Sequence, residues 1–238
     1  MGSTWTIEVG HSTRALARDY IRAGMAFALA AGGSIVELSA FDEAGLDAAT
    51  DVLGRARRDF RRVSVHAPVA NVRGSEAELV ARLGSLGLPV VVHPEKIATP
   101  ECWRPLGDRL LVENNDGRKA SGSTAAELAL LFAALPEARL CLDVSHALDV
   151  GGPALVEAFA TTFRGRLAQL HAGCGCGARP GEHLEPEVLR AVSVAVAAAG
   201  RPLPVIIERS ATTSTVALAQ VYAVRGAVVA GMAARDAA

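Results

Sequence analysis

Residues 109–143 carry the pattern that decides the fold: RLLVE (Arg109–Glu113), TAAELALLFAAL (Thr124–Leu135) and RLCLD (Arg139–Asp143). The first and last segments are short apolar runs that end in a carboxylate, without strict alternation of apolar and polar residues. Such runs are typical of parallel strands that are buried on both faces. The middle segment has the apolar periodicity of an amphipathic helix. The stretch therefore predicts a strand–helix–strand unit with parallel strands.

The same unit recurs along the chain. The other expected strands are Thr6–Val9, Ser34–Leu38, Arg62–His66, Pro89–His93, Arg166–His171 and Leu203–Glu208. The other expected helices include Ala44–Arg58, Ser75–Leu86, Pro186–Ala199 and a long closing helix, Ala211–Ala234. Eight strands alternating with helices in 238 residues predict an α/β fold, the (β/α)8 TIM barrel. Its eight strands are parallel, and its active site lies at the C-terminal rim. We expect a single domain over residues 1–238, because no linker interrupts the pattern.

A doubly wound open sheet is the alternative fold. It is disfavoured because neither GxGxxG nor GxxxxGK[ST] follows the first expected strand. Polar residues also end most of the strands, rather than gathering at one switch point. Residue types at the helix boundaries fit the assignment in either fold. Ser12 or Thr13 and Ser123 or Thr124 are expected to cap helices, and Gly87 and Gly200 to end them.

The composition excludes a disordered chain, because half of the residues are hydrophobic. The 24 Lys and Arg residues nearly balance the 25 Asp and Glu residues, which makes nucleic acid or an anionic membrane an unlikely partner. Four cysteines are too few for a disulfide framework, and the N-terminus does not look like a signal peptide. The apolar stretches Ala23–Ala31 and Ala191–Ala199 are too short to span a bilayer. We expect a soluble, cytoplasmic protein that acts on a small molecule.

Acidic or imidazole side chains end seven of the expected strands. They are Glu37, His66, His93, Glu113, Asp143, His171 and Glu208. His146 follows Asp143 by three residues, and His183 lies in the loop after the seventh strand. A single polar residue at a strand end is usually only a hydrogen-bonded rim residue. Solvation does not require a particular strand register, however, so their joint placement predicts one site at the C-terminal rim.

A divalent metal would make this gathering of carboxylates and imidazoles favourable, because buried like charges need a partner of opposite sign. Mixed His and carboxylate ligands without thiolates suit Zn²⁺, Mn²⁺, Fe²⁺ or Co²⁺. The candidate ligands are more numerous than one tetrahedral shell requires. We therefore expect one metal per chain, or two that are bridged by a carboxylate.

In their order along the chain, these motifs resemble the xylose isomerase-like TIM barrels, from VELS at residues 36–39 to IIERS at residues 206–210. This superfamily contains sugar isomerases, sugar epimerases and the endonuclease IV group. The resemblance to the epimerase branch implies one metal, held by Glu113, Asp143, His171 and Glu208. It also implies that Glu113 and Glu208 act as the acid and base.

The resemblance to the endonuclease IV branch adds four histidines. VHAP supplies His66, VVHPE supplies His93, DVSH supplies His146 and PGEH supplies His183. Gly181 stands where that branch has the Asp of a D-x-H motif. This departure puts a third metal, held by His146 and His183, in doubt.

Three functions follow from these observations. The first is a metal-dependent isomerase or epimerase of a sugar or sugar phosphate, in which the carboxylates transfer a proton. The alternative is an endonuclease IV-like multinuclear phosphodiesterase that acts on a phosphoester. The second alternative is a barrel that binds metal without catalysis.

Substrate contacts are expected from residues around the rim. Glu37 is expected to bind substrate hydroxyls and His11 to line the pocket mouth, while Arg118, Lys119 and Arg179 are candidates for binding a phosphate. The apolar closing helix offers a surface for a homodimer as well as a cover for the barrel.

Overall fold

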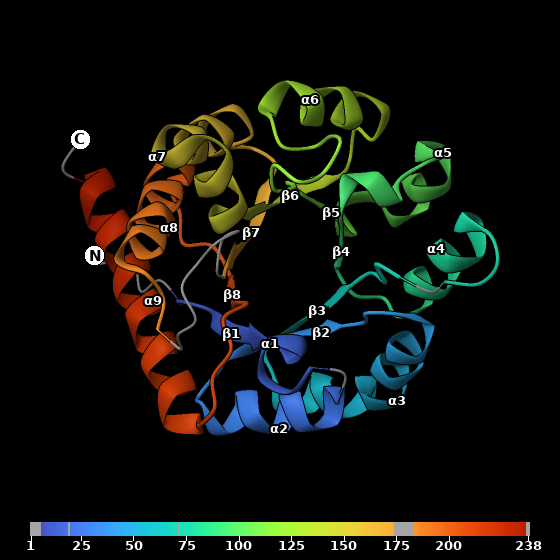
Figure 1. Ribbon diagram of the computed structural model, residues 1–238, viewed down its shortest axis with the longest axis horizontal. Helices are drawn as coiled ribbons and strands as arrows, with labels where there is room; N and C mark the ends of the chain where they lie inside the picture. Colours follow the sequence, from blue (N-terminus) through green and yellow to red (C-terminus); the bar gives the residue numbers. More distant parts are fainter. Residues whose placement is uncertain (1–5, 19, 71, 174–182, 237–238) are drawn as a thin grey trace.

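The protein is described by a computed structural model, which places residues 6–18, 20–70, 72–173 and 183–236. Within these residues, eight parallel strands form a closed barrel in chain order, with β8 paired to β1. Figure 1 shows the ring of strands with the helices packed around its outside. The predicted (β/α)8 barrel is therefore confirmed, and the open sheet is excluded because a closed barrel has no edge strands.

The strands agree with the predicted runs at most positions. They are β1 Val9–Ser12, β2 Ile35–Ser39, β3 Arg62–His66, β4 Val90–Val92, β5 Leu110–Glu113, β6 Arg139–Asp143, β7 Leu167–Ala172 and β8 Val205–Ile207. The first strand differs, since it begins where the predicted run, Thr6–Val9, ends. Gly10 explains why β1 lies so close to β2: a Cβ at this position would be 1.7 Å from the carbonyl oxygen of Ile35.

The helices form the outer layer. They are α1 Thr13–Ala17, α2 Ile21–Ala30, α3 Glu43–Asp59, α4 Glu76–Ser85, α5 Pro100–Trp103, α6 Ala125–Ala134, α7 Val144–Thr162, α8 Pro186–Ala199 and α9 Ser214–Asp236, with short 3-10 helices η1 Pro94–Lys96 and η2 Arg104–Arg109.

Several helix boundaries follow the predicted chemistry. Thr124 caps α6 in a reciprocal capping box with Glu127, and Gly87 and Gly200 have the positive φ angles that glycine favours. The prediction that Ser12 or Thr13 caps α1 is wrong, because the N-cap residue, Ser12, makes no side-chain capping bond.

Part of the interior of the barrel is apolar. Val91, Leu111 and Cys141 form a small apolar cluster on neighbouring strands. Two residues further along β5 and β6, on the same face of the sheet, stand Glu113 and Asp143. The strand register thus places Glu113 and Asp143 nearer the C-terminal end of the barrel than this apolar cluster. Gln169, beside Cys141, and Glu37 make the interior polar next to the cluster.

Helix α9 covers the side of the barrel next to β1 and β8. By length and composition it is apolar enough to cross a membrane, a test that core helices of soluble proteins also pass. Val221, Val224 and Val228 are buried, and the helix packs against α8 and α2. Tyr222 and Val229 remain exposed on its outer face. A homodimer through this face stays a prediction, as do a cytoplasmic location and the absence of membrane and nucleic-acid partners.

Candidate active site

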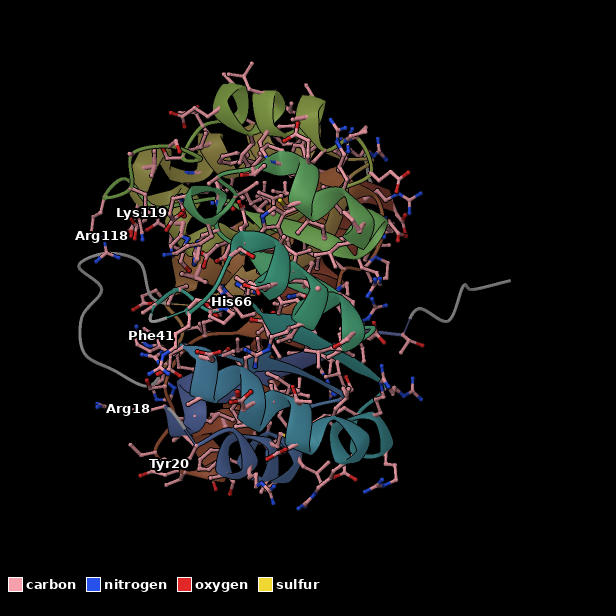
Figure 2. All side chains as sticks on the ribbon, turned by 90° about the vertical axis from the view of Figure 1, so that its right-hand side faces the viewer. Arg18, Tyr20, Phe41, His66, Arg118 and Lys119 are labelled. Carbon is pink, nitrogen blue, oxygen red and sulfur yellow. The ribbon has the colours of Figure 1, made fainter. Side chains whose placement is uncertain are left out.

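A pocket of about 260 Å³ opens at the C-terminal end of the barrel. Its lining residues include His66, His93, Glu113, His146 and Glu208, which come from five different β-strand ends or the turns after them. Figure 2 shows Phe41, Arg118 and Lys119 at this end of the molecule, with His66 deeper inside. Five of the predicted rim residues therefore converge around one cavity.

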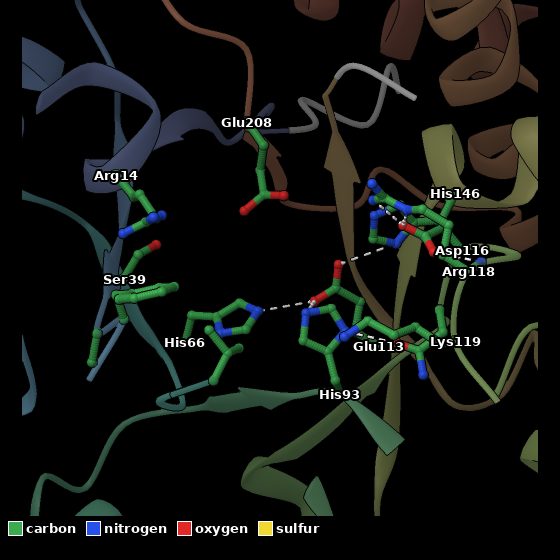
Figure 3. A pocket seen from close by; sticks show the side chains of 14 residues that line it. Arg14, Ser39, His66, His93, Glu113, Asp116, Arg118, Lys119, His146 and Glu208 are labelled. Atoms are coloured by element: carbon green, nitrogen blue, oxygen red, sulfur yellow. Dashed lines mark hydrogen bonds and ion pairs between the residues drawn. The ribbon is translucent and has the colours of Figure 1, made fainter. Parts of the chain in front are cut away.

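Two groups of side chains in this region could hold a metal, and they share Glu113. One consists of Glu113, Asp143, His171 and Glu208, and the other of Glu113, His66 and His93. In each group the potential ligand atoms lie within 4.8 Å of one another. Glu113 belongs to both groups, and Figure 3 shows its carboxylate next to His66 and His93. Its Oε2 lies 3.1 Å from Nε2 of His66, and its Oε1 lies 3.2 Å from Nδ1 of His171.

Three histidines of the pocket have Nδ1 bound to a neutral oxygen. Nδ1 of His66 donates to the carbonyl oxygen of Ala67 at 2.9 Å. Nδ1 of His146 donates to the carbonyl oxygen of Asn114 at 3.0 Å, and Nδ1 of His93 donates to Oδ1 of Asn115 at 2.9 Å. Each bond leaves Nε2 as the atom available to a metal, which is how ligating histidines are usually oriented.

Asp143 is held by the start of α7. Its Oδ1 accepts the backbone N–H groups of Ser145 and His146, at 2.7 and 2.8 Å, as the N-cap of the helix. The side chain of Asn114 bonds to both the N–H and the carbonyl oxygen of Asp143. These bonds fix the carboxylate so that its other oxygen, Oδ2, lies 3.6 Å from Nδ1 of His146.

Burial and neighbouring charges often shift the pKa values of the site residues in opposite directions. Burial alone would raise the pKa of Glu113, but His171 and His93 hold that pKa well below its usual range. Burial opposes protonation of His66, yet its hydrogen bond with Glu113 raises its pKa to about 9. Removal from water raises the pKa of Glu208 to about 7, and the nearby Glu113 carboxylate also raises it. Without a metal, the positive charges of protonated imidazoles balance the negative charges of the carboxylates.

The donor set fits a divalent metal. Glu113, Asp143 and His171 are almost completely buried, and such a concentration of carboxylate is costly unless a cation or proton compensates it. Nitrogen and carboxylate donors without a thiolate suit Zn²⁺, Mn²⁺, Fe²⁺ or Co²⁺. A cation at this position would replace the protons of the metal-free cluster.

Several residues predicted for the site have other positions. His11 belongs to β1, is fully buried and bonds to Gln220 of α9 at 2.9 Å, so it does not line the pocket mouth as predicted. Successive residues of a strand face opposite sides, and Ser12 is the one that turns inward, to Ser39. His183 is exposed and belongs to neither ligand group among the described residues. Arg179 and Gly181 lie outside the described residues.

Glu37 is inside the barrel but does not line the pocket. It is fully buried, and its Oε2 accepts hydrogen bonds from Ser64 and Gln169. Its contact to the ligand cluster is Oε2 to Nε2 of His171, at 3.2 Å. The structure therefore places Glu37 next to a potential ligand rather than at the wall that a substrate would touch.

Arg118 and Lys119 line the pocket, as predicted for phosphate-binding residues, and each is paired with a carboxylate. Arg118 bonds to Asp116, and Nζ of Lys119 lies 2.7 Å from Oε1 of Glu95. The prediction missed Arg14, which lines the opposite wall with its guanidinium 4.1 Å from the ring centroid of Phe41. Figure 3 shows Arg14 and Arg118 on opposite sides of Glu208 and Glu113.

Comparison with known proteins identifies structures that share this fold. No protein-family model and no curated protein sequence matches the chain. Among solved structures, L-ribulose 3-epimerase is 14% identical over 98% of this chain and 96% of its own, with a TM-score of 0.63. A D-tagatose 3-epimerase-like protein is 15% identical over 96% of this chain and 100% of its own, with a TM-score of 0.67. The chain has the fold of these epimerases.

A third similar structure is a xylose isomerase-like TIM barrel protein from Mycobacterium smegmatis in complex with magnesium. It is 13% identical, covers 98% of this chain and 100% of its own, and has a TM-score of 0.59. The resemblance to xylose isomerase-like barrels is thereby confirmed as a likeness of fold. The chemistry of this chain depends on its own residues.

Proposed function

We propose that this protein is a divalent-metal-dependent isomerase or epimerase that acts on a sugar or a sugar phosphate. The observation that supports this most strongly is the group of Glu113, Asp143, His171 and Glu208, whose ligand atoms lie within 4.8 Å of one another. Two of the four, Glu113 and Glu208, line the pocket. The similar folds of the named sugar epimerases agree with it.

The arrangement of the two glutamates suits proton transfer. Glu113 ends β5 and Glu208 follows β8, so the two carboxylates reach the pocket from different sides of the barrel. A sugar bound between them would meet a carboxylate on each face. One carboxylate removes the proton from the carbon beside the carbonyl, and the other returns a proton to the opposite face, which inverts that carbon.

A metal held by Glu113, Asp143, His171 and Glu208 would make that C–H more acidic by polarising the adjacent oxygens. The remaining tasks belong to the protein. His66 and His146, which line the pocket, would hold substrate oxygens through Nε2, because Nδ1 of each is bound to a carbonyl oxygen. Arg14, Arg118 and Lys119 would bind the end of the substrate, including a phosphate if one is present.

Deuterium incorporation tests this proposal. The protein is stripped with chelator, loaded with Mn²⁺ or Co²⁺, and incubated in deuterated water with a panel of ketoses and ketose phosphates. We expect an epimer or isomer whose reacting carbon carries deuterium, because the proton exchanges with solvent on the carboxylate. Glu208→Gln protein, treated in the same way, is expected to incorporate none. Product formation without deuterium, or no product from the metal-loaded protein across the panel, would contradict the proposal.

A second candidate function is hydrolysis of a phosphoester by two metals. The observation that favours it is the second ligand group, in which His66 and His93 face Glu113. Two metals bridged by one carboxylate would activate water and stabilise the leaving oxygen. Release of inorganic phosphate or an alcohol from a phosphoester panel, with two metals per chain that fall to one in the His66→Ala/His93→Ala variant, would favour this function. Metal binding without turnover in either panel would favour a non-catalytic barrel.

A further inference from the structure

Glu37 is an unusual residue for the inside of a barrel. Its side chain is 0% exposed, and it stands below the pocket among residues of β2, β3 and β7. Among the described residues its Oε1 has no hydrogen-bond partner, while three donors surround Oε2. A buried carboxylate is more costly than an apolar side chain of similar size. The free-energy cost of burying Glu37 must be offset by a favourable interaction. The contacts of Oε2 identify that interaction.

The contacts of His171 differ from those of the other histidines at the site. In His66, His93 and His146, Nδ1 is bound to a neutral oxygen, and in His66 and His93 Nε2 is the nitrogen nearest Glu113. In His171 the ring is reversed. Nδ1 faces the ligand group, 3.2 Å from Oε1 of Glu113 and 3.7 Å from Oε2 of Glu208. Nε2 lies 3.2 Å from Oε2 of Glu37 and 3.1 Å from the side-chain amide nitrogen of Gln169. An ionised carboxylate only accepts hydrogen bonds, so the contact with Glu37 requires the proton to be on Nε2, and the Gln169 amide then donates to Oε2 and not to Nε2.

The other contacts of Glu37 hold its carboxylate in this place. Ser64, which is directly opposite Glu37 in the β2–β3 register, donates to Oε2 at 3.1 Å. Gln169 donates to the same oxygen at 2.9 Å and lies two residues before His171 on β7, on the same face of the strand. Hydrogen bonds from two strands, β3 and β7, therefore hold Oε2 of Glu37 in position to accept from His171.

We propose that Glu37 is the positioning residue for the metal ligand His171: it accepts the Nε2–H and thereby keeps Nδ1 unprotonated and directed at the metal. A histidine that ligates through one nitrogen needs its proton on the other, and a carboxylate acceptor also makes the ring a stronger donor to the metal. This inference rests on the proposed metal site. It gives Glu37 a role through His171 and no contact with substrate.

Metal affinity tests the inference without an activity assay. Wild type, Glu37→Gln and Ser64→Ala proteins are stripped of metal, and their Zn²⁺ affinities are measured by competition with a chromophoric chelator. Glu37→Gln keeps the shape, but its amide can donate to Nε2 and so favour the wrong tautomer. We expect its Zn²⁺ affinity to fall roughly 10- to 100-fold, the usual effect of losing such a partner. Ser64→Ala is the matched comparison, because it removes one of the donors to the same oxygen and leaves the contact with His171; its affinity should fall less than that of Glu37→Gln.

A measurement on the unaltered protein keeps the test valid if Glu37→Gln fails to fold. The ring nitrogens of ¹⁵N-histidine-labelled, Zn²⁺-loaded wild type are observed by NMR, and the His171 signals are identified by their loss in His171→Asn. We expect a protonated Nε2 and a metal-bound Nδ1. A proton on Nδ1, or a metal on Nε2, would overturn the inference.

The outcomes separate this inference from the proposed function. Wild type that binds no divalent metal would overturn both. Wild type that binds Zn²⁺ tightly, with Glu37→Gln within twofold of the same affinity and Ser64→Ala unchanged, would overturn the role of Glu37 alone. A large loss in both variants to the same extent would also overturn it, since that result indicates a general disturbance of the barrel interior.

Discussion

Glu208 is the carboxylate of the ligand group that remains partly open to the pocket, with 29% of its side chain exposed. Replacing it with Gln removes the proton acceptor and changes little of the packing, because the two side chains have the same shape. We expect Glu208→Gln to lower kcat by at least about 100-fold, the usual contribution of a general acid or base. The unfolding transition should be nearly unchanged. Glu157→Gln on the exposed face of α7 is the control and should retain full activity; full activity in Glu208→Gln would exclude both enzymatic functions.

His11 gives a prediction about stability and pH. Burial lowers its pKa from 6.5 to about 4, although the hydrogen bond with Gln220 opposes this. As pH falls from 6.5 to 4 the unfolded chain therefore binds a proton at His11 that the folded protein does not. The folded state loses stability over this window, by up to about 3 kcal/mol from this residue.

The His11→Gln variant isolates this effect, because all other histidines titrate equally in variant and wild type. The free energy of unfolding is measured with urea at intervals from pH 7 to pH 4. The variant should lose less stability than wild type as the pH falls, so the two curves converge or cross. A His11→Gln curve that stays parallel to wild type would show that His11 is not a buried neutral imidazole.

Strand β1 and helix α9 offer a matched pair of glycine substitutions. A Cβ on Gly10 would lie 1.7 Å from the carbonyl oxygen of Ile35, so β1 and β2 would have to separate. A Cβ on Gly226, in α9, would have no atom within 4 Å. We expect Gly10→Ala to lower the free energy of unfolding by about 3 kcal/mol or more, and Gly226→Ala to raise it by up to about 1 kcal/mol. Chemical denaturation measures both; equal effects would mean that the close β1–β2 approach is absent.

For the molecule as a whole, metal should act as a stabilising ligand. The ligands of the site come from β5, β6, β7 and the end of β8, which are separate in the unfolded chain. Metal therefore binds the folded barrel in preference to the unfolded chain and, at about 100 times its Kd, adds about 2.7 kcal/mol. We expect Tm to rise by roughly 5 to 10 °C with Mn²⁺, Co²⁺ or Zn²⁺, and to return to its original value with chelator. No shift with any of these ions would contradict the metal site.

The architecture and the clustering of four potential metal ligands followed from the sequence, and particular residues show why. Runs such as Arg139–Asp143 combine the length, the apolar content and the terminal carboxylate of a buried parallel strand, and local pattern is enough to recognise them. Because every parallel strand of a barrel ends on the same face, strand ends alone brought Glu113, Asp143, His171 and Glu208 together.

The orientation of side chains was decided by tertiary structure. His11 and Ser12 are neighbours in sequence, but the start of β1 and its pairing with β2 determined that Ser12 faces inward and His11 faces α9. Whether Glu37 meets a substrate or supports His171 depends on its register with Ser64 and Gln169, from other strands. Arg14 lies at the pocket wall and contacts Phe41, and no local pattern in the sequence predicts this contact. A sequence determines which segments are strands through short-range periodicity, whereas the partner of each side chain is fixed only when segments distant in the chain pair and pack.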